Sequence, residues 1–224
     1  IVGEPTDMQV VDGQKGVAIF RTEITGHEAH SSQPHRGASA IMAAGRLIAK
    51  ITQMTERRAS EAPSDSPFMP PYTTMTVGVI EGGTAANILA RRCCFTWDVR
   101  IVPGDDLAAI HAEFDAEATK VLADMRAIAP ECEIITERLA DGPPLMPHAE
   151  NAAAELAHTL TGSNSRRSVS YAAEAGQFQQ AGFSTVICGP GSIDQAHQPN
   201  EFITIQQVEE GTRFMRGLIR HLSA

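Results

Sequence analysis

Alternation of apolar and polar residues predicts four β-strands, over residues 16–25, 72–81, 92–102 and 131–137. The alternation is most regular over 92–102. Every second side chain of that segment is apolar, namely Cys93, Phe95, Trp97, Val99 and Ile101. We therefore expect this strand to bury one face and to expose the other, which carries polar side chains.

Two helices are predicted between these strands. Apolar residues three and four positions apart favour a helix over 37–58, and a second helix from a cap at Pro103-Gly104-Asp105 to about Ala127. The resulting order over 16–137 is β-α-β-β-α-β. This order predicts a ferredoxin-like α+β arrangement, with two helices on one face of an antiparallel sheet. The other face of the sheet remains free for solvent or a partner.

The rest of the chain has a different character. After a Gly-Pro-Pro segment, the pattern predicts helices over 149–161 and 174–181, and short strands over 168–172 and 184–188. A final amphipathic helix carries the apolar residues Ile205, Val208, Met215, Leu218 and Leu222. The second short strand is apolar throughout, as in a buried parallel sheet. These pieces resemble half of a doubly wound α/β domain.

Composition excludes several classes of protein. The chain has 224 residues, a formal net charge of -9, 42% hydrophobic residues and 20% charged residues, which is ordinary for a globular protein. The acidic balance and the lack of a Lys/Arg cluster argue against a nucleic-acid partner. Without an apolar run of about 20 residues, we expect no membrane span.

The cysteines and the first residues add two expectations. Four cysteines without metal-ligand spacing indicate free thiols in a reducing, cytoplasmic environment: Cys93, Cys94, Cys132 and Cys188. The chain starts with Ile1-Val2-Gly3, without an initiator Met or a signal peptide. We therefore expect it to be a piece of a longer protein.

Two candidate chemical features lie near the start of the chain. Glu4 ends an apolar strand-like stub, a place where a carboxylate suits a metal or catalytic site, although a solvated glutamate is the simpler alternative. His30 lies in a polar loop that also contains His27, Glu28 and His35. The Pro and Gly content of that loop argues against the helix that a four-ligand zinc site would need. A single functional histidine is therefore favoured over a metal cluster, and a surface histidine without a role remains the alternative.

Two further features follow. Asn87 precedes the best strand, and Arg100 lies on its polar face, where a guanidinium could bind a substrate carboxylate or pair with Asp98. The Gly189–Glu201 loop follows the buried strand and contains Ser192 and His197. A long ordered loop at a strand end, with consecutive glycine amides that can form an anion nest, favours a function.

Four segments of the chain resemble motifs of the M20 family of metallo-aminoacylases and peptidases. They are Gly3-Glu4-Pro5-Thr6, Gly26 to His30 with Ser31-Ser32, Gly82 to Arg100, and Gly189 to Glu201. The last segment is long and specific, and it is most similar to the branch that deacetylates N2-acetylornithine. Ala90 departs from the family pattern, which usually has proline there. We expect this difference to change the stiffness of the loop rather than its chemistry.

The resemblance implies a domain organisation and a set of roles. Residues 13–138 would form a ferredoxin-like lid (dimerisation) domain, inserted into a partial zinc-peptidase-like α/β domain of residues 1–12 and 139–224. Glu4 and His197 would each be a terminal ligand of one ion in a pair of Zn²⁺ or Co²⁺ ions. The remaining assigned residues would stabilise the oxyanion in the neighbouring subunit's site (His30), hold the substrate carboxylate (Asn87 and Arg100) or contact the amino-acid moiety (Gly189, Gly191 and Ser192).

The activity implied by the resemblance is hydrolysis of an N-acyl amino acid, with N2-acetylornithine as the preferred substrate and arginine biosynthesis as the pathway. A succinyl-diaminopimelate desuccinylase, a dipeptidase and a non-catalytic dimerisation module remain alternatives. The family's first metal-binding His, its bridging Asp and its Glu pair have no counterpart in this sequence. We therefore expect the isolated chain to be inactive. A homodimer is expected to form through the helix over 37–58 and an adjacent edge strand.

Overall fold

The computed structural model describes residues 1–196 and 198–223, and the chain divides into two compact units. Unit 1 comprises Ile1–Gly16, Asp65–Met69 and Gly142–Ala224, and unit 2 comprises Val17–Ser64 and Pro70–Asp141. The expected metal ligand His197 lies outside the described residues.

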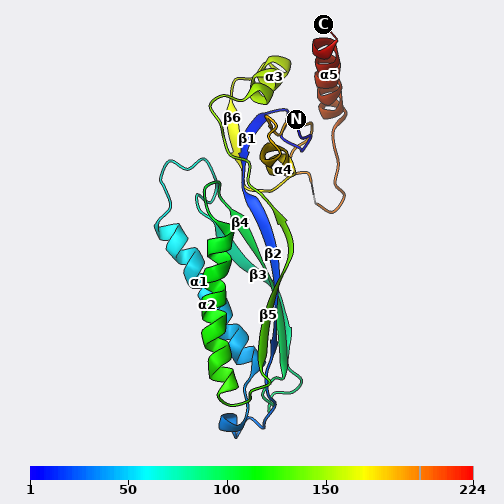
Figure 1. The fold of residues 1–224 in the computed structure, drawn as a ribbon. Coiled ribbons are helices and arrows are strands. Elements are labelled where there is room, and N and C mark those ends of the chain that lie inside the picture. The colour runs from blue at the N-terminus through cyan, green and yellow to red at the C-terminus, as the bar shows by residue number, and fades with distance from the viewer. Residues whose placement is uncertain (197, 224) are drawn as a thin grey trace. The chain divides into compact units, whose positions relative to one another are not determined.

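Unit 2 is a four-stranded sheet with two helices (Figure 1). The strands are β2 (Gly16–Thr25), β3 (Thr74–Gly82), β4 (Arg92–Ile101) and β5 (Glu133–Gly142), and the helices are α1 (Ala40–Ser60) and α2 (Leu107–Arg126). The strand order in the sheet is β3-β4-β2-β5, and β3 pairs with β4 in the antiparallel direction. Both helices cover the same face, which confirms the predicted ferredoxin-like arrangement.

Capping side chains set the first residue of each long helix. The helix predicted from Gly37 begins only after Ser39, whose hydroxyl accepts a backbone N–H of the first turn at 3.4 Å. Asp106, rather than the expected Asp105, caps α2, and its carboxylate accepts a backbone N–H at 2.8 Å. The carboxylate of Asp105 instead accepts the hydroxyl of Thr73 at 2.5 Å. A short helical turn that the pattern did not predict, η1 (Pro34–Arg36), precedes α1.

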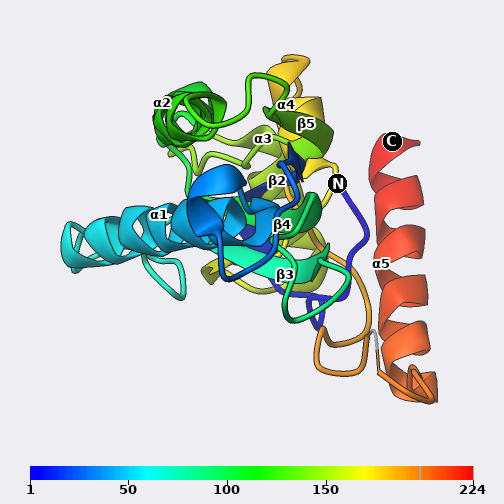
Figure 2. The ribbon, with the colours of Figure 1, turned by 90° about the horizontal axis from the view of Figure 1, so that it is seen from below.

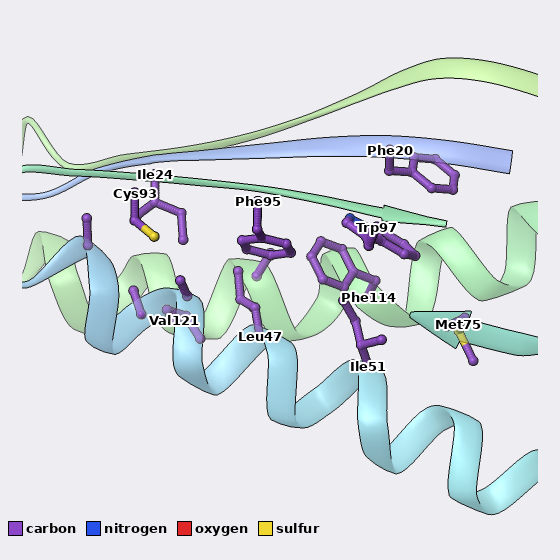
Figure 3. Packing of buried hydrophobic residues seen from close by; sticks show 14 of the residues in the cluster. Phe20, Ile24, Leu47, Ile51, Met75, Cys93, Phe95, Trp97, Phe114 and Val121 are labelled. Carbon is purple, nitrogen blue, oxygen red and sulfur yellow. The ribbon is translucent and has the colours of Figure 1, made fainter. Parts of the chain in front are cut away.

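Aromatic side chains form the centre of the unit 2 core (Figure 3). Phe95 and Trp97 extend from β4 towards the helices, as the alternating pattern predicted. Trp97 stacks on Phe20 with ring centroids 4.5 Å apart, and it meets Phe114 at 4.8 Å. The indole N–H of Trp97 donates to the hydroxyl of Thr22 at 3.1 Å, so this buried polar atom is satisfied.

Unit 1 is built around a small parallel pair of strands, β1 (Val10–Gln14) and β6 (Arg166–Val169). Its helices are α3 (Ala152–Thr161), α4 (Ala175–Gln180) and α5 (Ile205–Leu222). Strand β1 was not predicted, because all of its residues are buried and no alternation marks it. The segment predicted as a strand over 184–188 forms only isolated bridges, in which Ile187 pairs with Val2 and Val11.

The final helix was predicted correctly, and much of its apolar surface is exposed. Thr204 caps α5 through a reciprocal pair of hydrogen bonds with Gln207. Phe214 is buried, but most apolar side chains of the helix are not. The N-terminal segment runs alongside α5 (Figure 2), and the two contribute to the lining of an apolar groove of about 540 Å³. Among the described residues, no helix is long and apolar enough to cross a membrane.

Candidate functional site

In unit 1, the segment that carries Glu4 is bound directly to the Gly189 loop. The backbone N–H groups of Thr6 and Met8 both donate to the carbonyl of Gly189, at 3.2 and 3.0 Å. The N–H of Gly189 donates in return to the hydroxyl of Thr6 at 3.1 Å. Thr6 also forms an antiparallel bridge with Ser192. The fold therefore brings Glu4 together with three of the predicted substrate-binding residues, although they lie more than 180 positions away in the sequence.

The glycines of this loop have physical reasons to be glycine. A Cβ atom at Gly189 would lie 2.6 Å from the carbonyl oxygen of Glu4, so a larger residue would displace the segment that carries this glutamate. Gly191 has a φ of +88°, a backbone conformation that favours glycine. Ser192 stabilises the turn that follows, because its hydroxyl accepts the backbone N–H of Asp194 at 3.4 Å.

Tyr171 lies close enough to Glu4 for their electrostatic interaction to matter. Burial raises the pKa of Tyr171 to about 12, and the negative charge of Glu4 adds to this effect. The Tyr171 hydroxyl is buried, and it has no hydrogen-bond partner among the described residues. The phenol is therefore a neutral donor at neutral pH. No sequence motif pointed to Tyr171, and its spatial proximity to Glu4 is the only signal.

The fit of a metal to unit 1 depends on the donor set. The half-buried carboxylate of Glu4 has the chemistry of a zinc ligand. Within the part of the chain that the structure describes, however, no three His, Cys, Asp or Glu side chains gather at one point. The described residues thus supply one suitable ligand and do not form a complete metal site.

In unit 2, the structure brings His30 and Asn87 together. His30 and Ile88 form an isolated antiparallel bridge. The bridge is flanked by two backbone hydrogen bonds, from Ser31 to the carbonyl of Asn87 at 2.9 Å and from Leu89 to the carbonyl of Ala29 at 2.8 Å. The two loops are thereby joined, although both His30 and Asn87 have exposed side chains.

The ring of His30 is held by the residue two positions later. Its Nδ1 atom lies 2.7 Å from the hydroxyl oxygen of Ser32, and the backbone N–H of Ser32 donates to the same Nδ1 at 3.2 Å. His27 has a different partner, because its Nδ1 lies 2.5 Å from a carboxylate oxygen of Glu131. The ring of His27 is thus hydrogen-bonded to a carboxylate, whereas the ring of His30 is hydrogen-bonded to Ser32.

Arg100 lies on β4 and is paired with Asp98, the alternative that the sequence left open. Its Nε donates to the Asp98 carboxylate at 2.8 Å, and the hydroxyl of Thr76 donates to the same carboxylate. The loop that contains Asn87 begins at the opposite end of this strand, where the N–H of Gly83 donates to the carbonyl of Arg92. The eight residue steps from Arg92 to Arg100 span about 26 Å. The structure therefore does not bring Asn87 and Arg100 of one chain together.

Comparison with known proteins identifies the family. A profile of the peptidase dimerisation domain of the M20 family matches residues 12–126, which is half of the chain. The chain belongs to this family.

Among curated relatives, acetylornithine deacetylase of Myxococcus xanthus is 32% identical over 211 residues, covering 93% of this chain and 53% of the relative. Acetylornithine deacetylase of Proteus mirabilis is 33% identical over 224 residues, covering 99% of this chain and 55% of the relative. The chain thus spans about half the length of the curated relatives it matches.

Solved structures support the fold. An aminopeptidase of Bacillus cereus superposes with a TM-score of 0.75 at 18% identity, covering 100% of this chain and 56% of that one. A tripeptidase of Staphylococcus aureus superposes with a TM-score of 0.71 at 20% identity, covering 96% and 54%. At this level of identity the likeness concerns the fold alone.

Proposed function

We propose that this chain is part of a metal-dependent amide hydrolase that removes the acyl group from an N-acyl amino acid, with N2-acetylornithine as the substrate. The products would be ornithine and acetate, as in arginine biosynthesis in the cytoplasm. The observation that carries the proposal is the attachment of the Glu4 segment to the Gly189 loop in unit 1. The relatives named above, which match nearly the whole chain, are acetylornithine deacetylases.

The roles proposed for unit 1 are those that the family resemblance implies, and this attachment supports them. Glu4 and His197 would each hold one ion of a zinc or cobalt pair, together with further ligands that we expect to lie outside these 224 residues. When bound, such a pair would polarise the acyl carbonyl and lower the pKa of a water molecule. Gly189 and Gly191 would keep the Glu4 segment in place, and Ser192 would contact the amino-acid moiety. The isolated chain is then expected to be inactive.

The roles in unit 2 divide between the two ends of the sheet. At one end, His30 would donate a hydrogen bond to the oxyanion that develops on the acyl carbonyl, and Asn87 would bind the substrate from the adjoining loop. Arg100, at the other end, would bind a carboxylate through the guanidinium group that Asp98 orients. Because His30 and Asn87 are distant from Arg100, we propose that the two ends of one lid serve different substrate molecules in a dimer.

We further propose that unit 2 forms the homodimer through β3 and α1. β3 is an edge strand of the sheet, so its outer backbone groups are available for pairing with a second copy. Its apolar side chains Val79 and Ile80 are about half exposed, and Met42 on α1 is 71% exposed. An edge strand beside exposed apolar groups suits a two-fold interface.

A chimera tests the activity. The part of the Myxococcus xanthus deacetylase that this chain does not span would be joined ahead of Ile1, and amine release from N2-acetylornithine would be measured with zinc or cobalt. We expect hydrolysis that is lost in Glu4→Ala, while Glu28→Ala, an exposed glutamate of unit 2, retains it.

The same assay separates the alternatives. If the chimera prefers N-succinyl-diaminopimelate or a dipeptide, the proposed substrate is wrong, but the proposed reaction class, amide hydrolysis, is retained. A folded, metal-loaded chimera that hydrolyses none of these compounds would contradict the proposed activity and would favour a non-catalytic dimerisation module.

A further inference from the structure

Two histidines three positions apart have opposite kinds of partner at the same ring atom. Nδ1 of His30 meets the backbone N–H and the hydroxyl of Ser32, at 3.2 and 2.7 Å. Nδ1 of His27 meets a carboxylate oxygen of Glu131 at 2.5 Å. A neutral imidazole carries its single proton on one of its two nitrogens. A partner that can only donate places the proton on the other nitrogen, and a partner that can only accept places it on the nitrogen that the partner contacts.

For His30, the contact with the backbone N–H identifies the tautomer, and the shorter contact with the hydroxyl reinforces it. A peptide N–H can only donate, so Nδ1 of His30 must be the acceptor in that hydrogen bond. The Ser32 hydroxyl, which can rotate, then donates to the same nitrogen. The ring proton of neutral His30 consequently lies on Nε2, the nitrogen that Ser32 does not contact.

For His27, the opposite holds. An ionised carboxylate can only accept, and the pKa of Glu131 is lowered by its own backbone hydrogen bond and by the one from His27. Glu131 is therefore ionised at neutral pH, and Nδ1 of His27 must carry a proton. This loop thus holds one histidine as the Nε2–H tautomer and the other with its proton on Nδ1.

The backbone of His30 is fixed as well as its ring. The bridge to Ile88 and its two flanking hydrogen bonds hold the chain on both sides of His30. Because the side chain is exposed, packing does not orient it. The hydrogen bonds from Ser32 orient the ring instead. Holding an exposed donor in one orientation reduces the reorganisation that binding of an anionic oxygen would require.

We propose that Ser32 is a positioning residue that holds His30 as its Nε2–H tautomer. In this form His30 presents a hydrogen-bond donor for an anionic oxygen. It does not present the Nε2 lone pair that a metal ion would need. The tautomer follows from the contacts within unit 2, whereas its use at an oxyanion rests on the proposed function.

The experiment measures both tautomers in one sample. The 224-residue chain would be labelled with ¹⁵N, and long-range ¹H–¹⁵N correlations of the ring atoms would be recorded at about pH 9, where imidazoles are neutral. We expect the proton of His30 on Nε2 and that of His27 on Nδ1. Histidine-to-glutamine variants assign the signals, and free N-acetylhistidine methylamide in the same buffer gives the unbiased ratio. A His30 with its proton mainly on Nδ1, or with the unbiased ratio, overturns the proposal.

Matched serine variants show which group holds the tautomer of His30. Ser32→Ala removes the shorter of the two hydrogen bonds to Nδ1 and leaves only the one from the backbone N–H, so we expect the His30 ratio to move part of the way towards that of the free compound. Ser31→Ala, the neighbouring exposed serine, should leave the ratio unchanged, and Glu131→Gln should affect His27 alone. An unchanged His30 ratio in Ser32→Ala would show that the Ser32 hydroxyl does not hold the tautomer, and this would overturn the proposal.

A kinetic measurement distinguishes this proposal from the proposed function. In the chimera, Ser32→Ala should lower kcat by about tenfold with little change in KM, because misorientation of one donor weakens transition-state stabilisation. Ser31→Ala should retain kcat. If the chimera is inactive while the spectra show the expected tautomers, the proposed function fails and the positioning by Ser32 stands. Equal kcat values for the two serine variants of an active chimera would contradict the role of Ser32 in catalysis.

Discussion

The two units reach stability by different means. In unit 2, both helices and all four strands contribute to one continuous core with stacked aromatic rings at its centre. In unit 1, the buried apolar residues form two small clusters around β1, and backbone bridges between short segments join the rest. The difference shows that side-chain packing shapes the dimerisation domain, whereas backbone pairing holds the segments that carry Glu4 and Gly189.

The largest expected effect concerns the two cores. Leu47 in unit 2 and Leu145 in unit 1 are both fully buried. Leu47→Ala should lower the free energy of unfolding of unit 2 by about 4 kcal/mol, because the surrounding core can close only in part around the cavity. Trp97 is the only tryptophan and lies in unit 2, so its fluorescence during urea unfolding reports that unit.

Leu145→Ala serves as the matched control and should leave the Trp97 transition in place. A shift of this transition as large as that of Leu47→Ala would contradict the comparison, because it would show that the two units unfold as one.

The next effect concerns association through unit 2. Ile80 on β3 and Ile135 on β5 are 51% and 53% exposed, on opposite edges of the sheet. Ile80→Lys should raise the Kd of the dimer more than tenfold, because it places a charge in the proposed interface, and Ile135→Lys should not. Light scattering after size exclusion measures both. Equal dissociation in the two variants, or a wild-type chain that stays monomeric at high concentration, would exclude this interface.

A smaller effect concerns the ion pairs between α1 and α2. Glu113 accepts hydrogen bonds from Arg57 and Lys50, and these lower its pKa to about 2. Because this value lies below that of an unfolded glutamate, the ionised form stabilises the folded protein. Glu113→Gln should therefore cost about 1 kcal/mol at neutral pH.

This difference between Glu113→Gln and the wild type should shrink as the pH falls from about 4.5 to about 2. Urea unfolding across this range checks the direction. A difference that stays constant with pH would contradict the role of ionised Glu113.

The smallest expected effect is on the stability of each unit when one of its glycines is replaced by alanine. Gly45 lies exposed in α1 with space around it, so Gly45→Ala should stabilise unit 2 by about 0.5–1 kcal/mol. Gly191 has a φ of +88°, so Gly191→Ala should destabilise unit 1 by about 1 kcal/mol. Hydrogen exchange of backbone amides in each unit measures both changes. The same sign in both variants would contradict the conformational argument.

The sequence predicted unit 2 well because its strands bury one face. On β4, side chains alternate between core and solvent, so the hydrophobic pattern of the sequence predicts both the strand and its buried face. β1 has no such alternation, since all five of its residues are buried, and it was missed. The strand predicted around Ile187 is reduced to isolated bridges, a difference that local pattern cannot reveal.

The candidate site was predictable as a set of residues but not as an arrangement. Motif resemblance pointed to His30, Asn87 and Arg100 together, and only the loop pairing showed that the first two are neighbours. The length of β4 separates Arg100 from them. Tyr171 interacts electrostatically with Glu4, and Ser32 is hydrogen-bonded to the ring of His30, and no motif in the sequence identifies either interaction.

The most direct test of the central claim is complementation between two inactive chimeras. One carries Glu4→Ala in unit 1 and the other carries His30→Ala in unit 2. If the two units contribute to catalysis from different copies, mixing the two variants should restore part of the hydrolysis of N2-acetylornithine, since each mixed dimer keeps one intact site. Native mass spectrometry would verify that mixed dimers form. Mixed dimers without restored activity would contradict the account.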